Sequence, residues 1–148
     1  MKRTGKAGPR MVTLTLMLLI ALIGASCAST GEKGESLLRQ SVETFNDSFR
    51  LEDYEGASTF IAHNKKGEFW AEVDRFKGKI RLSDYELREV HFSKGKGESA
   101  LAILHFQYWR PESPVLKSVI VTQRWYYSEK EKIWRLGDSG FGVIVGAR

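Results

Sequence analysis

Polar side chains interrupt two strongly apolar stretches in the second half of the chain, residues 98–109 and 116–127. A histidine gains and loses a proton near neutral pH, and the planar guanidinium of an arginine pairs with carboxylate or phosphate groups. These polar residues and one adjoining aromatic ring are the candidate ligand contacts of the chain: His105, Gln107, Thr122, Arg124 and Trp125. The structural alternative is a hydrogen-bonded histidine on a half-buried strand and a solvated arginine.

Aromatic residues gather near the ends of the same predicted strands. Such residues dominate recognition surfaces, so they could form a platform for a ligand or a partner protein. Core and edge packing is the alternative, because six aromatic side chains on three strands cannot all face outwards. The six are Tyr108, Trp109, Trp125, Tyr126, Tyr127 and Trp134.

Acid–base catalysis has little support from these residues. Proton abstraction needs a positioned base, commonly a carboxylate or a histidine. After Glu98 the two apolar runs contain no Asp or Glu, which leaves His105 as the base, with Asp74 or Tyr54 from the helices. The sequence therefore favours a binding module without catalytic chemistry, and a small acid–base enzyme is the alternative.

Metal, cofactor and nucleic-acid functions are not predicted. The three histidines, His63, His91 and His105, are scattered without the close spacing of metal ligands, and no glycine-rich phosphate loop or serine-nucleophile motif occurs. Four of the 23 Lys and Arg residues precede position 11, so the rest of the chain carries 19 basic and 18 acidic residues. The basic excess belongs to the leader, and no nucleic-acid partner is expected.

The leader has the layout of a bacterial export signal. Four basic residues precede an apolar run, residues 11–23, which is too short for the roughly 20 residues of a membrane span. The run ends in Gly24, Ala25 and Ser26, followed by Cys27, the only cysteine of the chain. This junction resembles a lipobox, the cleavage site of bacterial lipoproteins, although Gly24 stands where an aliphatic residue is usual.

The resemblance implies that residues 1–26 are a signal peptide and that the Cys27 thiol carries a diacylglyceryl group with palmitate-like chains. Two or three acyl chains hold a protein firmly on a membrane. Because no aspartate follows Cys27, the resemblance favours the outer membrane, facing the periplasm, over the inner membrane. The alternatives are an inert thiol beside an ordinary secretory cleavage site and an uncleaved anchor.

The remaining chain predicts a tether and one domain. Residues 27–35 lack large apolar side chains and should form a flexible tether, whereas residues 36–148 form a single α+β domain. Apolar residues then recur at helical spacing in three segments, around 38–49, 51–61 and 69–80. Gly56 and Gly78 weaken the second and third of these helices.

After Ser83 the apolar period changes from helical spacing to two, which indicates strands. Four strands are predicted, over 84–93, 98–109, 116–127 and 133–136, with loops at 94–97, 110–114 and 128–132. Short loops make neighbouring strands antiparallel. Residues 141–145 are either a strand extension or a tail that packs over the sheet.

Three helices followed by a meander resemble the nuclear transport factor 2-like superfamily, in which three helices cover a curved antiparallel sheet. The resemblance covers about residues 36–137 and rests on the element order, the segment 53–57, and the closing segments 125–127 and 133–135. That family has a short strand between its second and third helices, and no candidate stands near 63–66. A cystatin-like fold is the alternative, but it leaves two helices unexplained.

The family resemblance implies a pocket at the open end of a cone. Together with the anchor, it predicts a membrane-anchored binding or assembly module of the cell envelope. The partners expected are the membrane through Cys27, a small hydrophobic ligand or an envelope protein, and a second copy of the chain. An isomerase- or dehydratase-like enzyme that uses the cone pocket is the alternative function.

Overall fold

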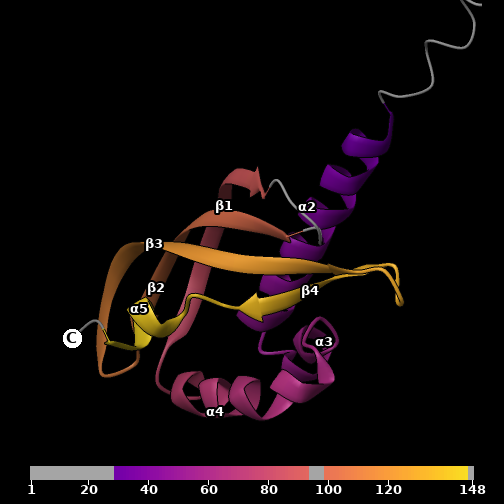
Figure 1. The fold of residues 1–148 in the computed structure, drawn as a ribbon. Coiled ribbons are helices and arrows are strands. Elements are labelled where there is room, and N and C mark those ends of the chain that lie inside the picture. Colours follow the sequence, from indigo (N-terminus) through magenta and orange to yellow (C-terminus); the bar gives the residue numbers. More distant parts are fainter. Residues whose placement is uncertain (1–28, 94–98, 147–148) are drawn as a thin grey trace, which may run out of the picture. The chain divides into compact units, whose positions relative to one another are not determined.

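A computed structural model describes residues 29–93 and 99–146 of the chain (Figure 1). The predicted signal peptide and Cys27 lie outside these residues. The elements are α2 (Ser29–Arg50), α3 (Tyr54–Ser58), η1 (His63–Lys65), α4 (Lys66–Phe76), β1 (Arg81–Phe92), β2 (Ser99–Arg110), β3 (Ser113–Ser128), β4 (Ile133–Asp138) and α5 (Gly142–Gly146).

Helix α2 confirms the first predicted helical stripe. Leu38, Val42, Phe45 and Phe49 are all at most 2% exposed, as a repeat of four, three and four residues requires. The helix begins at Ser29, so most of the segment predicted as a flexible tether is helical. Glu32, Lys33 and Glu35 are good helix formers, and extending the existing helix α2 by a further residue costs less than starting a new one, even with Gly31 and Gly34 present. By its packing, the chain divides after residue 36.

The second predicted helix is shorter than the sequence pattern suggested. Leu51 is 68% exposed, and Glu52 has a left-handed backbone with φ of 62°, which ends α2 before α3 begins. Asp53 caps α3 by accepting a hydrogen bond from the backbone N–H of Gly56 at 3.0 Å. Helix α3 is therefore a single capped turn.

Helix α4 buries Phe69, Val73 and Phe76 and stops at Phe76. Gly78 follows with φ of 74°, a conformation that glycine adopts without steric cost and that ends helices. Ile80 is buried, as its place in the pattern predicted, but it lies beyond the helix. The third predicted helix thus exists with an earlier end.

The four strands form one antiparallel sheet in the order β1-β2-β3-β4, which confirms the predicted meander. The loop expected over 110–114 is only a tight turn, because Arg110 pairs with Ser113 across the hairpin. Pro114 lies in the first part of β3, where no strand pairs on the β4 side. A residue without a backbone N–H is tolerated at such an edge.

The short strand that the family resemblance implied is reduced to one bridge. Ile61 pairs in parallel with Leu136 of β4, and the Leu136 N–H donates to the Phe60 carbonyl at 2.9 Å. A single bridge leaves no alternating pattern in the sequence, which explains why none was seen.

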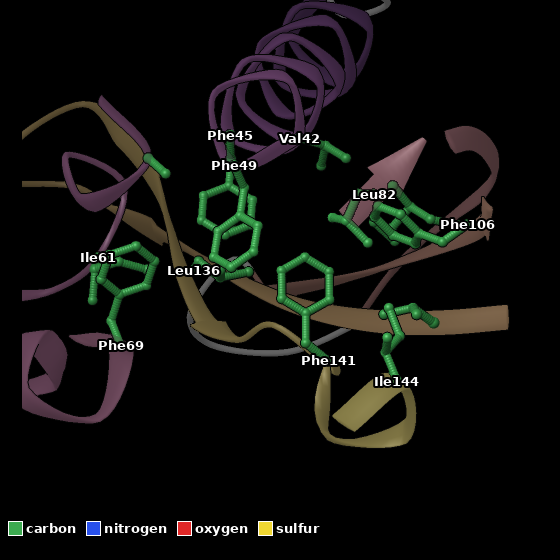
Figure 2. Close-up of a cluster of buried hydrophobic side chains, with 14 of the residues drawn as sticks. Val42, Phe45, Phe49, Ile61, Phe69, Leu82, Phe106, Leu136, Phe141 and Ile144 are labelled. Atoms are coloured by element: carbon green, nitrogen blue, oxygen red, sulfur yellow. The ribbon is translucent and has the colours of Figure 1, made fainter. Parts of the chain in front are cut away.

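Aromatic rings fill the core between the helices and the sheet, and Phe141 lies among them (Figure 2). Its ring is fully buried, with centroids 4.7 Å from Phe49, 5.2 Å from Phe76 and 5.4 Å from Phe106. Of the two alternatives for this segment, the strand extension is wrong and the packed tail is right. Phe141 lies directly before the short helix α5, and Phe141 and Ile144 are both buried in the core.

A glycine turns the chain into this position. Gly140 has φ of 69°, and a Cβ on it would lie 2.4 Å from the Thr122 carbonyl oxygen. Only glycine fits a left-handed residue packed so close to a neighbouring strand. The far end is held by Arg110, whose guanidinium donates to the Ile144 carbonyl at 3.0 Å.

One polar pair lies inside the apolar core. Asn46 on α2 and Gln123 on β3 are both fully buried. Their amides bond in both directions, Asn46 Nδ2 to Gln123 Oε1 at 3.1 Å and Gln123 Nε2 to Asn46 Oδ1 at 2.8 Å. The Trp125 ring N–H also donates to Gln123 Oε1, at 3.3 Å. Because buried amides need partners, this pair fixes the position of α2 against β3.

Candidate functional site

The structure does not bring the five predicted pocket residues together. Trp125 is fully buried in the core and its ring packs against Phe45. His105 and Gln107 alternate with the buried residues of β2, and Thr122 and Arg124 alternate with those of β3, so these four lie on the outer face of the sheet.

The strand register fixes how the polar side chains lie on this outer face. His105 lies opposite Ile120 on one side and Glu86 on the other, and Thr122 lies opposite Ile103. His105 and Thr122 are therefore diagonal neighbours on adjacent strands and not directly opposed partners. Of the four, Arg124 lines a hollow of the surface.

That hollow is an open groove of about 620 Å³, here called the β4 groove. It lies among η1, α4, β3 and β4. Its lining combines buried apolar residues with charged and polar side chains. The lining residues are Ile61, Ala62, Lys65, Glu68, Phe69, Glu72, Arg124, Tyr126, Arg135, Leu136, Gly137, Asp138 and Ser139.

A β-bulge shapes the groove. Trp125 pairs with Leu136 but Arg124 pairs with Asp138, so Gly137 is the extra residue of β4. A Cβ on Gly137 would lie 2.3 Å from Cε2 of Tyr126, which means that the Tyr126 ring rests directly on the glycine backbone. The bulge thereby places Arg124 and Asp138 side by side at the groove and leaves room for a flat aromatic wall.

Glu72 is the carboxyl group of the groove with the most unusual surroundings. Its Oε1 accepts a hydrogen bond from the Ser139 hydroxyl at 2.7 Å, and Ser139 is 8% exposed. Burial raises the pKa of Glu72 above its ordinary value, against the lowering effect of the Ser139 hydrogen bond. The neighbouring Asp138 raises this pKa further, and Arg75 lowers it.

Glu72→Gln should flatten the dependence of stability on pH. Because the folded pKa of Glu72 is raised, the native state binds the extra proton, so stability falls as pH rises from about 4.3 through the folded pKa. Glutamine accepts the same Ser139 bond without a charge, and we expect the variant to lose less stability between pH 5 and 8. Urea unfolding across pH 4–8 measures this. Glu68→Gln, a change to an exposed carboxyl of the same helix, is the control, and an unchanged profile in Glu72→Gln would contradict the assignment.

The groove carries both signs of charge, and most of its cations are already paired. Lys65 bonds to Glu68 at 2.9 Å, and Arg135 bonds to Glu131 at 2.8 Å and to the Thr59 carbonyl. Arg124, in contrast, makes no ion pair or hydrogen bond through its guanidinium within the described part of the chain. It is the cation of the groove that is available to a ligand.

Sequence reasoning missed Glu72, although a signal was present. Phe69, Glu72, Val73 and Phe76 stand at helical spacing on one face of the third predicted helix. A carboxylate inside an apolar stripe is expensive to bury, so it marks a candidate site. Asp74, which the sequence offered instead, is exposed on the other side of that helix.

The groove offers hydrogen bonding, charge and an aromatic wall. Across the described ranges, 29–93 and 99–146, no group of three His, Cys, Asp or Glu residues is arranged to hold a metal ion. Within the same ranges, no helix has the length and apolar content needed to cross a bilayer. No Asp, Glu, Lys, Arg or His of the described chain is buried in the core.

Comparison with solved structures gives the fold. A ketosteroid isomerase-like protein from Erwinia carotovora atroseptica SCRI1043 matches with a TM-score of 0.55 and 10% sequence identity, over 68% of this chain and 88% of that chain. No protein-family model and no curated protein matches the sequence. With helices α3 and α4 both present before the meander, the cystatin-like alternative fails. The chain has the α+β fold of ketosteroid isomerase-like, nuclear transport factor 2-like proteins.

Proposed function

We propose that this chain is a lipid-anchored binding module of the cell envelope and that the β4 groove is its ligand site. The observation that carries the binding role is the groove of about 620 Å³, lined by Arg124, whose guanidinium has no partner among residues 29–93 and 99–146. A concave site with a few polar groups over an apolar floor is typical of small-molecule binding.

The anchor is supported by the sequence around Cys27: a basic start, an apolar run and small residues directly before the thiol. Its position without a following aspartate favours the outer membrane, facing the periplasm. The sequence led us to expect a hydrophobic ligand. Because several charged side chains line the groove, a polar ligand or an envelope protein fits it better. The exposed outer sheet face is compatible with a homodimer.

Cys27→Ser should release the protein from membranes. Without the thiol no acyl chain can be attached, and two or three chains are what hold a lipoprotein in place. Fractionation of a bacterial host at high salt, followed by mass spectrometry of the intact chain, measures both location and acylation. A variant that stays in the membrane fraction would overturn the lipoprotein proposal, and Thr30→Ser, a conservative change beyond the junction, is the control.

Native mass spectrometry of the full-length chain in mild detergent tests the groove. A retained small molecule that is lost in Arg124→Ala would support a ligand site in the β4 groove. The same molecule should be kept in Val143→Ala, a change to a residue of α5 that does not line the groove. A ligand that survives Arg124→Ala would place binding elsewhere.

An acid–base enzyme is the second candidate, because Glu72 is a partly buried carboxyl with a hydrogen-bonded hydroxyl beside it. It would act in the β4 groove and not in the core, with Glu72 in place of His105 as the base. If Glu72→Gln still binds the molecule found in the groove but no longer converts it to a product, the result would favour the enzyme.

A further inference from the structure

We propose that the β4 groove binds a saccharide, with one sugar ring stacked on Tyr126 and its hydroxyls bonded to Arg124, Glu72 and Asp138. The proposal rests on the function proposed above and names the ligand class of the same groove. Three observations carry it: the position of the Tyr126 ring, the balance of charge in the groove, and the pairing of donors with acceptors.

The first observation concerns the aromatic wall. One edge of the Tyr126 ring lies against Gly137, where a Cβ would stand 2.3 Å from Cε2 and 2.8 Å from Cδ2, yet the side chain remains 45% exposed and lines the groove. The absence of a side chain at Gly137 thus gives the ring its place, and the ring keeps exposed surface for a ligand. The axial C–H groups of a sugar ring give it an apolar face, which packs on a flat aromatic surface as other apolar groups do.

The second observation concerns charge. The walls carry three cations, Lys65, Arg124 and Arg135, and three carboxyl groups, Glu68, Glu72 and Asp138. A ligand with net charge of either sign would meet attraction and repulsion together, because like charges in one site disfavour each other. A neutral ligand avoids that conflict.

The third observation is that donors and acceptors lie side by side. Arg124 and Asp138 lie opposite each other in the strand register. The Arg124 guanidinium can only donate hydrogen bonds, and the Asp138 carboxylate can only accept them. A little further along, Ser139 donates to Glu72 at 2.7 Å. A hydroxyl both donates and accepts, so a ligand with several hydroxyls can satisfy neighbouring guanidinium and carboxylate groups at once, whereas a carboxylate or an ammonium ligand cannot.

Saturation-transfer NMR on the full-length chain tests the proposal, with maltotriose and chitotriose as probes. The chain is kept in lauryldimethylamine oxide, because maltoside and glucoside detergents would compete. We expect saturation of the ring protons of at least one sugar. Maltotriose alone would indicate a plain glucan, and chitotriose alone a polymer of N-acetylated amino sugars.

The variants identify the stacking residue. Tyr126→Ala should raise the Kd of the bound sugar about tenfold or more, whereas Tyr126→Phe, which keeps the ring, should stay within about threefold of the parent. Ile120→Ala, an exposed change on the same strand outside the groove, should leave the Kd unchanged. Far-ultraviolet circular dichroism of each variant confirms that it is folded.

Two results would overturn the saccharide proposal. One is the absence of transfer to both sugars at millimolar concentration, and the other is binding that Tyr126→Ala leaves unchanged. If native mass spectrometry then still shows a retained molecule that depends on Arg124, the groove remains a binding site and only the ligand class is wrong. If neither sugar nor retained molecule is found, the binding function itself fails.

Discussion

Phe141→Ala should lower the free energy of unfolding by about 3–5 kcal/mol, the range for removing a large aromatic side chain from a packed core. The ring of Phe141 has no exposed surface and lies within 5.4 Å, centroid to centroid, of Phe49, Phe76 and Phe106. Alanine would leave a cavity among aromatic rings that rigid elements on several sides keep from collapsing. Urea denaturation followed by tryptophan fluorescence measures the loss.

The matched control is Val143→Ala, two residues further along, on α5. Val143 is 50% exposed, so its truncation should change stability by no more than about 0.5 kcal/mol. Equal effects of the two variants would mean that α5 stabilises the domain only weakly and that Phe141 is not a core residue. A smaller denaturant slope in Phe141→Ala would add that the segment after β4 has detached.

Asn46→Leu and Gln123→Leu should each destabilise the domain strongly, and together by less than the sum. Asn46→Leu orphans Nε2 of Gln123, whose Oε1 keeps the Trp125 ring N–H, and Gln123→Leu orphans both Asn46 Oδ1 and that ring N–H. Each buried polar group left without a partner costs about 1–3 kcal/mol. In the double variant the two amides are gone together, so the penalty of an unpaired amide is not incurred twice.

A double-mutant cycle in urea measures this coupling. Because Trp125 keeps an unpaired N–H in both the Gln123→Leu and the double variant, the double variant should remain less stable than the parent. Ser41→Ala, which removes an exposed hydroxyl that bonds only the Leu37 carbonyl of its own helix, is the control. Additive losses would show that water reaches the pair, so that neither amide is orphaned when the other is removed.

The helices and strands were largely predictable because each has one buried face. The spacing of Leu38, Val42, Phe45 and Phe49 is set by the helix period alone, and all four are buried. Ends of elements were less predictable, since they depend on backbone angles such as φ of 62° at Glu52 and on hairpin pairing that a local pattern does not contain.

The pocket residues were predictable only in part. Side chains on a strand alternate between faces, so Trp125 cannot share a face with Arg124, its neighbour in sequence. The alternation of strand faces alone therefore places Trp125 on the opposite face of β3 from Thr122 and Arg124. The groove itself depends on the extra residue Gly137 in β4 and on Ser139 meeting Glu72 from a different element. No local pattern joins residues so far apart in the chain.

The place of Phe141 also has a consequence for when the domain can fold. Its ring packs on Phe45 and Phe49 of the first described helix, with all four strands between them in the chain. A chain made from its N-terminus onward cannot close this core until the segment after β4 has been synthesised, and contacts between distant residues form slowly. Under the lipoprotein proposal the precursor carries an export signal, and late closure would keep the polypeptide unfolded and able to thread through a membrane channel. Burial of Phe141 would then mark the point after which the folded chain can no longer be exported.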